Sequence, residues 1–118
     1  MKHSLSRVLA LVVTLSISMG SAAMFTGNDL LQACADKDDA HMFPQCLAYI
    51  RGAHDGHDVI SALYKQDSYY CLPDNVTLGQ TGKVVSKYLE NHPEELHEAA
   101  IVLVYGALMR AFPCEDDQ

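Results

Sequence analysis

The sequence predicts a small all-α protein, a single-domain helical bundle of about four helices with two disulfides. Between the glycines and prolines, apolar residues recur at steps of three and four, the period of a helix. The chain has 118 residues, which is the length of one domain. Its four cysteines follow an N-terminal segment typical of exported proteins, where an even number of cysteines indicates disulfides.

That N-terminal segment predicts a cleaved signal peptide over residues 1–23. Lys2 and Arg7 flank its start, an apolar run follows, and residues 20–23 are the small ones that a signal peptidase needs. The run is shorter than the roughly 20 residues that span a bilayer, which disfavours a membrane anchor. We place the cut after Ala23, with Ala22 as second choice, and expect a periplasmic protein.

Cleavage makes the chain more acidic. Residues 24–118 hold six basic and 15 acidic side chains, a formal charge of −9, because Lys2 and Arg7 are lost. An acidic domain does not favour nucleic acid or an anionic membrane surface, so we expect neither as a partner. The charge suits a basic protein partner, although solubility alone would also explain it.

Two helices are predicted in the first half of the mature chain. The first begins at Thr26 or Asn28 and is followed by an acidic loop, residues 36–39. The second begins near Met42 or Pro44. Its apolar face continues to Val59, Ile60, Leu63 and Tyr64, while Gly52 and Gly56 predict a kink or break around residues 54–58.

Two more helices are predicted in the second half. Thr77 and Gln80 have the spacing of a capping box, which starts a helix that runs to about Asn91. Residues 92–95 open the fourth helix, with Pro93 at its first helical position, and Pro113 ends it.

The positions of the cysteines at helix ends favour one pairing. Cys34 and Cys46 flank the turn between the first two helices, and Cys71 and Cys114 flank the last two, so antiparallel hairpins would pair 34–46 and 71–114. A zinc site is the competing interpretation. The cysteines are 12, 25 and 43 residues apart and include no tight C-x-x-C pair, so we expect disulfides.

The densest cluster of polar side chains is residues 54–58, His-Asp-Gly-His-Asp. Two imidazoles and two carboxylates could hold a divalent metal, but a solvated acidic turn is the simpler interpretation, and we expect no metal or cofactor. H-E-x-x-H, G-x-S-x-G, P-loop and Rossmann patterns are absent from the sequence. We therefore predict no catalytic residue and no enzyme activity.

A family resemblance rests on residues spread over the mature chain. It comprises Cys71-Leu72-Pro73, residues 76–80, 84–85, 87–89, 92–94, 96–97 and 99–100, and Ala111-Phe112-Pro113-Cys114, with Leu30, Leu31, Cys34, Cys46, Tyr49, Ile50 and Gly52 upstream. With these residues the chain resembles the Rap/Tai-type immunity proteins, which include the type VI secretion amidase immunity proteins. Thr81-Gly82 departs from the family, where a leucine and a polar residue are expected.

The resemblance implies a small all-helical periplasmic protein that binds a peptidoglycan-cleaving amidase effector and occludes its active site. Characterised pairs of this family often contain the immunity protein as a dimer, so a homodimer is also implied. From another class, a periplasmic acid-stress chaperone remains an alternative, because 15 acids and five histidines in the mature chain permit a pH switch.

The family motif does not locate the partner surface, so candidates come from exposed acidic loops and aromatic anchors. They are Asp38, Asp39, Asp55, Asp58, Tyr69 and Tyr70. For the two tyrosines a second interpretation carries equal weight, namely that they pack beside the disulfide of Cys71.

Overall fold

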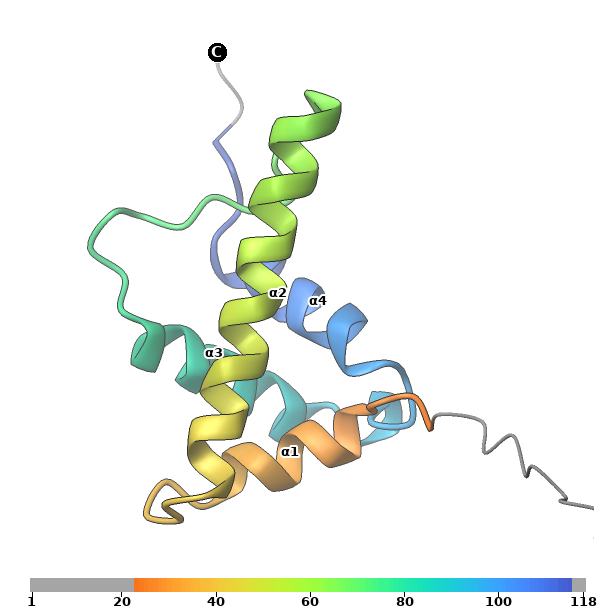
Figure 1. Ribbon diagram of the computed structural model, residues 1–118. Coiled ribbons are helices and arrows are strands. Elements are labelled where there is room, and N and C mark those ends of the chain that lie inside the picture. The colour runs from red at the N-terminus through yellow and green to blue at the C-terminus, as the bar shows by residue number, and fades with distance from the viewer. Residues whose placement is uncertain (1–22, 116–118) are drawn as a thin grey trace, which may run out of the picture.

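The computed structural model describes residues 23–115, and in this part of the chain it contains helices and no strand (Figure 1). The prediction of an all-α fold with four α-helices is confirmed. The predicted signal peptide lies outside the described residues. The helices are α1 (Gly27–Ala35), α2 (Met42–Tyr64), α3 (Leu78–Asn91), the short 3-10 helix η1 (Pro93–Glu95) and α4 (Ala100–Ala111).

The helices pack around α2, which crosses the bundle (Figure 1). Helices α1 and α3 lie against its first half, and α4 packs on α3 and reaches the middle of α2. Each helix contributes to one core. Its largest fully buried aliphatic side chains are Leu30, Ile50, Leu89, Leu108, Val85 and Val104.

Both predicted N-terminal caps are confirmed as capping boxes. The Asp29 carboxylate accepts a 2.8 Å hydrogen bond from the Thr26 amide, and the Thr26 hydroxyl faces the Asp29 amide. At α3, the Gln80 side chain accepts from the Thr77 amide at 2.7 Å, and the Thr77 hydroxyl accepts from the Gln80 amide at 3.2 Å. Each box satisfies two backbone donors that a helix end leaves free.

The predicted kink in the second helix is wrong, because α2 continues unbroken from Met42 to Tyr64. Gly52 and Gly56 lie on its exposed side, with no atom within 4 Å of the position where a Cβ would stand. A helical glycine costs about 1 kcal/mol relative to alanine. That cost alone does not end a helix whose other side is packed.

The predicted start of the fourth helix at Pro93 is also wrong. Pro93 starts η1, and α4 begins only at Ala100. The intervening turn pairs with the N-terminal segment: the Ala100 amide donates to the Phe25 carbonyl at 2.9 Å, and the Gly27 amide donates to the Glu98 carbonyl at 3.0 Å. These two long-range hydrogen bonds take the place of the hydrogen bonds that a helix starting at Pro93 would make here.

The predicted disulfide pairing is confirmed, with Cys34 bonded to Cys46 and Cys71 to Cys114. The first bridge joins α1 to α2 and is buried. The second ties the segment after α4 to the segment before α3 and lies near the surface. Beside it, the Cys71 amide donates to the Phe112 carbonyl at 2.9 Å.

The departure from the family at Thr81-Gly82 has a packing reason. A Cβ at Gly82 would lie 2.8 Å from the Cδ2 atom of Leu47, so glycine lets α3 approach α2 closely. Thr81 is buried, and its hydroxyl donates to the Thr77 carbonyl at 3.1 Å, which satisfies the polar group inside the protein.

Candidate functional site

One residue of the acidic loop before α2, Asp39, stabilises the start of that helix. One Asp39 carboxylate oxygen accepts hydrogen bonds from the His41 and Met42 amides, each at 2.8 Å. The Met42 and His41 amides hold the pKa of Asp39 below its usual value, because they favour its ionised form. Asp39 therefore acts as a cap for the start of α2, while Asp38 is exposed and available to a partner.

The second candidate region centres on His57, which is only 4% exposed. We call it the His57 junction; there α2, the returning segment 65–70 and α4 meet. The His57 ring stacks on that of Tyr70 at a centroid distance of 4.3 Å, and the edge of Tyr105 meets it at 6.0 Å. The junction comprises His54, His57, Asp58, Tyr69, Tyr70 and Tyr105.

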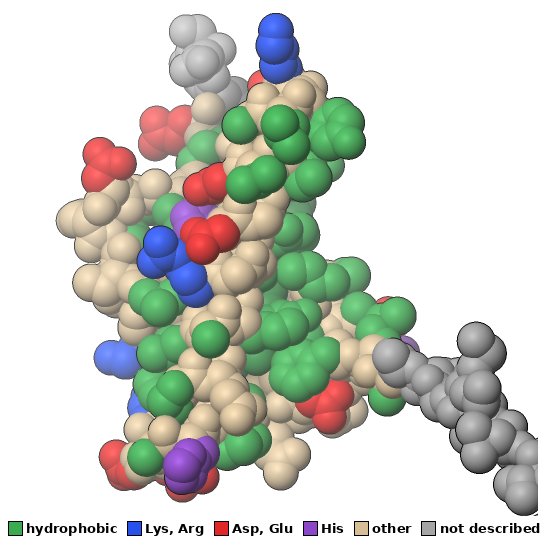
Figure 2. All heavy atoms as spheres, viewed as in Figure 1, with side chains coloured by type: hydrophobic (Ala, Val, Ile, Leu, Met, Phe, Trp, Pro, Cys, Tyr) green, Lys and Arg blue, Asp and Glu red, His purple; other side chains and the backbone are tan. Residues whose placement is uncertain are grey.

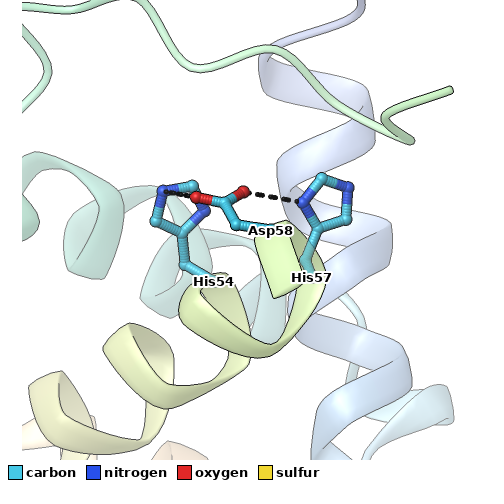
Figure 3. Close-up of side chains that lie close together, drawn as sticks. All are labelled: His54, His57 and Asp58. Atoms are coloured by element: carbon cyan, nitrogen blue, oxygen red, sulfur yellow. Dashed lines mark hydrogen bonds and ion pairs between the residues drawn. The ribbon is translucent and has the colours of Figure 1, made fainter. Parts of the chain in front are cut away.

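Hydrogen bonds at the junction fix the tautomer of His57. The Tyr69 amide donates to Nε2 at 3.2 Å, so Nε2 carries a lone pair and Nδ1 carries the proton of the neutral ring. Nδ1 lies 3.2 Å from Oδ1 of Asp58 and donates to it. The other Asp58 oxygen is 3.6 Å from Nε2 of His54, so the carboxylate lies between the two imidazoles (Figure 3).

This arrangement bears on the metal interpretation of residues 54–58. His54, His57 and Asp58 offer ligand atoms within 4.8 Å of one another. A metal on Nδ1 of His57 would replace the proton given to Asp58, leaving an imidazolate or breaking the bond from Tyr69. The contacts therefore support a hydrogen-bonded junction that anchors segment 65–70 to α2 rather than a metal centre.

The two tyrosines have different surroundings. Tyr70 is 2% exposed, and its hydroxyl lies 3.0 Å from Nδ1 of His54. Burial raises the pKa of Tyr70, so the phenol keeps its proton and donates it. The ring of Tyr70 is thus part of the core and does not fit an exposed interface anchor, whereas Tyr69 is 55% exposed and stays a candidate.

A cleft of about 270 Å³ opens next to the junction, between α2, the loop after Cys71 and the start of α3. Its lining combines apolar residues, among them Ile50 and Leu72, with polar ones that include Asp55 and Asp58. Arg51 donates to the Asp55 carboxylate at 2.9 Å. This cleft can accept a side chain of a partner, and Asp58, which contacts only the imidazoles of His54 and His57 among the ion pairs of the described chain, is an exposed carboxylate of its lining.

The C-terminal half of α2 differs from its prediction. Val59, Ile60, Leu63 and Tyr64 were expected on the buried side, but they are 48–71% exposed. The C-terminal half of α2 extends beyond the other helices that the structure describes (Figure 1). We call residues 58–69 the α2 limb. A signal for it is the length of α2, which has 23 residues, whereas the other described α-helices have nine to 14, so none of them alone can cover it from end to end.

The comparison with protein families identifies the class of protein to which this chain belongs. Residues 26–114 match the model of the Rap1a immunity proteins. The chain belongs to the Rap1a immunity protein family. No curated protein and no solved structure matches it.

Membership of the Rap1a family indicates an immunity protein against a secreted effector, that is, a non-enzymatic inhibitor. Its matched residues include all four cysteines, and the two disulfides together with the family indicate an exported protein. In the described part of the chain, none of the helices has the length and apolar character of a transmembrane segment.

Proposed function

We propose that the mature chain, residues 24–118, is a periplasmic Rap1a immunity protein that binds a type VI-secreted peptidoglycan amidase and covers its active site. The family match over residues 26–114 carries the proposal. It is supported by the disulfides, which form outside the reducing cytoplasm. In this proposal residues 1–23 are a signal peptide, so the mature protein begins at Met24.

Charge supports a protein partner with a basic surface. The mature chain has a formal charge of −9, which would accelerate association with a cationic enzyme and raise the salt dependence of the rate. Among the predicted contacts, Asp38, Asp55, Asp58 and Tyr69 are exposed and remain proposed contacts. The resemblance to characterised amidase pairs also favours a homodimer, which light scattering of the mature protein would measure.

A protection assay tests the proposal in cells. The product of the gene next to that of this chain is taken as the candidate amidase effector. Fused to an export signal, it is expressed in a bacterial host with or without this chain. The full chain should prevent lysis. The matched control, residues 24–118 without the signal, should fold poorly in the reducing cytoplasm and fail to protect. Lysis that proceeds equally with the full chain would contradict the proposal.

A second assay separates inhibition from general chaperone activity. Purified mature protein should stop peptidoglycan hydrolysis by the amidase at equimolar amounts at pH 7. An acid-stress chaperone would instead bind an apolar-surface dye strongly at pH 3 and protect unrelated proteins from aggregation. Protection of unrelated proteins without inhibition of the amidase would favour that alternative.

A further inference from the structure

The α2 limb exposes apolar side chains that are not buried in the core. Val59, Ile60, Leu63 and Tyr64 are 55%, 48%, 71% and 68% exposed. Their spacing places them on one side of the helix. Figure 2 shows hydrophobic side chains gathered along that side of the C-terminal half of α2. A contiguous apolar surface of this kind marks an interaction site in a soluble protein.

The limb is held in place at both its tip and its base. At the tip, Lys65 adopts a left-handed conformation with φ of 51°, and the Gln66 amide donates to the Ser61 carbonyl at 3.2 Å. At the base, the Tyr69 amide donates to His57, whose ring stacks on buried Tyr70. A surface that is already ordered loses less conformational entropy on binding, which favours affinity.

The charges beside the apolar side indicate what kind of partner fits. Asp55 and Asp58 have side chains 58% and 60% exposed, and Asp55 lies one helical turn before Val59, at the base of the apolar side. Asp67 is exposed on the returning segment. A partner with basic groups around an apolar recess would complement both features.

A second copy of the chain fits this surface less well. In a two-fold symmetric contact, the same patch faces itself. A contact between the limbs of two copies would join two chains that each have a mature charge of −9. Like charges brought together at an interface disfavour association.

We infer that the apolar side of the α2 limb is the surface that enters the effector. Leu63 and Tyr64 lie near the tip of the limb and enter the effector first. Ile60 and Val59 lie nearer the bundle and enter after them. The partner is a hydrolase whose cleft has apolar walls and a basic rim. This inference rests on the proposed function and deepens it, because it names the inserted element and the chemistry of the cleft that receives it.

Binding of the purified adjacent gene product, measured by calorimetry, tests the inference. Leu63→Asp and Leu63→Lys should each weaken binding by about 30-fold or more, the effect of removing an interface hot spot. Both charges are used because an aspartate would still attract a basic rim. Loss of binding with both variants indicates apolar burial, whereas loss with lysine alone would overturn the inference.

Val102 provides the matched control. It is an aliphatic side chain, 59% exposed, and lies in the first turn of α4, at the end of that helix away from the Cys71–Cys114 bridge. Val102→Asp and Val102→Lys should bind like the wild type, and circular dichroism should show the same helix content for all variants. Equal losses at Val102 and Leu63 would overturn the assignment to the limb.

The outcomes separate this inference from the proposed function. If the wild-type chain neither binds nor inhibits the amidase, the proposed function and the inference fail together. If the wild type binds and both Leu63 variants bind within threefold of it, only the inference fails. If the Leu63 variants keep effector binding but convert a dimer into a monomer by light scattering, a second copy occupies the limb and the inference is overturned.

Discussion

Gly27, in the first turn of α1, packs closely against Leu103 of α4 and against the backbone of Leu96. A Cβ there would overlap Cδ1 of Leu103 and lie 3.0 Å from the backbone of Leu96. Backbone atoms cannot turn away as the end of a side chain can. Gly52, in the exposed middle of α2, has no atom within 4 Å of the same position. The two glycines therefore predict opposite responses to alanine.

Gly27→Ala should lower the free energy of unfolding by about 1–3 kcal/mol, because the added methyl group overpacks the contact between α1 and α4. Gly52→Ala should raise it by about 0.4–1 kcal/mol, since alanine is the better helix former and has room. Urea unfolding followed by circular dichroism measures both. Stabilisation by Gly27→Ala would contradict the packing described here.

The buried phenol of Tyr70 predicts a weakness at alkaline pH. Burial raises the pKa of Tyr70 in the folded state, so the unfolded chain loses this proton first as pH rises. The stabilising contribution is complete below the ordinary phenol pKa of about 10 and declines above it. Between pH 9 and pH 11, the free energy of unfolding should fall more steeply for the wild type than for Tyr70→Phe. Parallel curves would contradict the prediction.

At the scale of elements, α1 depends on its capping box for its start. Hydrogen bonds from the amide and then the hydroxyl of Thr26 lower the pKa of Asp29 in the folded protein. A depressed folded pKa contributes stability above the unfolded pKa of about 3.9, and that contribution is lost as pH falls through the folded pKa.

Asp29→Asn should therefore lower the melting temperature at pH 7, and the difference from the wild type should be smaller at pH 2, because Asp29 loses its charge as the pH falls through its folded pKa. Thermal unfolding across this pH range measures the effect. Glu90→Gln, at an exposed position of α3, is the control and should show no such convergence. A difference that is the same at both pH values would show that charge on Asp29 has no role.

Local signals in the sequence were enough to predict where most helices begin. Thr26 and Thr77 cap α1 and α3 through contacts three residues away, so the pattern contains all the information needed. The start of α4 could not be predicted in this way. It depends on hydrogen bonds from Gly27 and Ala100 to residues about 70 positions distant, which no local spacing reveals.

The candidate site was predicted only in part, for a related reason. The apolar period of α2 runs through Ile50 to Leu63, but periodicity does not say where the neighbouring helices end. The apolar residues of the limb, Val59, Ile60, Leu63 and Tyr64, were consequently expected on the buried face. Tyr69 and Tyr70 are adjacent in sequence, yet the stack on His57 buries Tyr70 and leaves Tyr69 at the surface. That difference arises from tertiary packing.

At the scale of the whole molecule, the two disulfides differ in access. Cys34 and Cys46 are 1% and 0% exposed, whereas Cys71 lies at the surface. A thiol reductant should therefore open the Cys71–Cys114 bridge first. Timed reduction, alkylation and mass spectrometry should find labels on Cys71 and Cys114 before Cys34 and Cys46. Earlier labelling of the buried pair would contradict this order.

Opening the Cys71–Cys114 bridge should also lower the free energy of unfolding by more than its place near the surface suggests. It closes a loop of 43 residues, against 12 for the other bridge. Chain entropy then predicts contributions of about 4 and about 3 kcal/mol, respectively. Urea unfolding of protein reduced at only the outer bridge, trapped by alkylation, measures the larger value. An unchanged midpoint would contradict the estimate.

The loops closed by the two disulfides do not overlap, and residues 47–70 belong to neither. Lys65, exposed at the turn of the limb, lies in this uncrosslinked stretch. A single tryptic cut after Lys65 would thus leave two pieces, each closed by its own bridge, with no covalent bond between them. They would separate on a non-reducing denaturing gel. After such a cut only the shared core would hold the two halves together, which makes them candidates for a split protein that reassembles from its fragments.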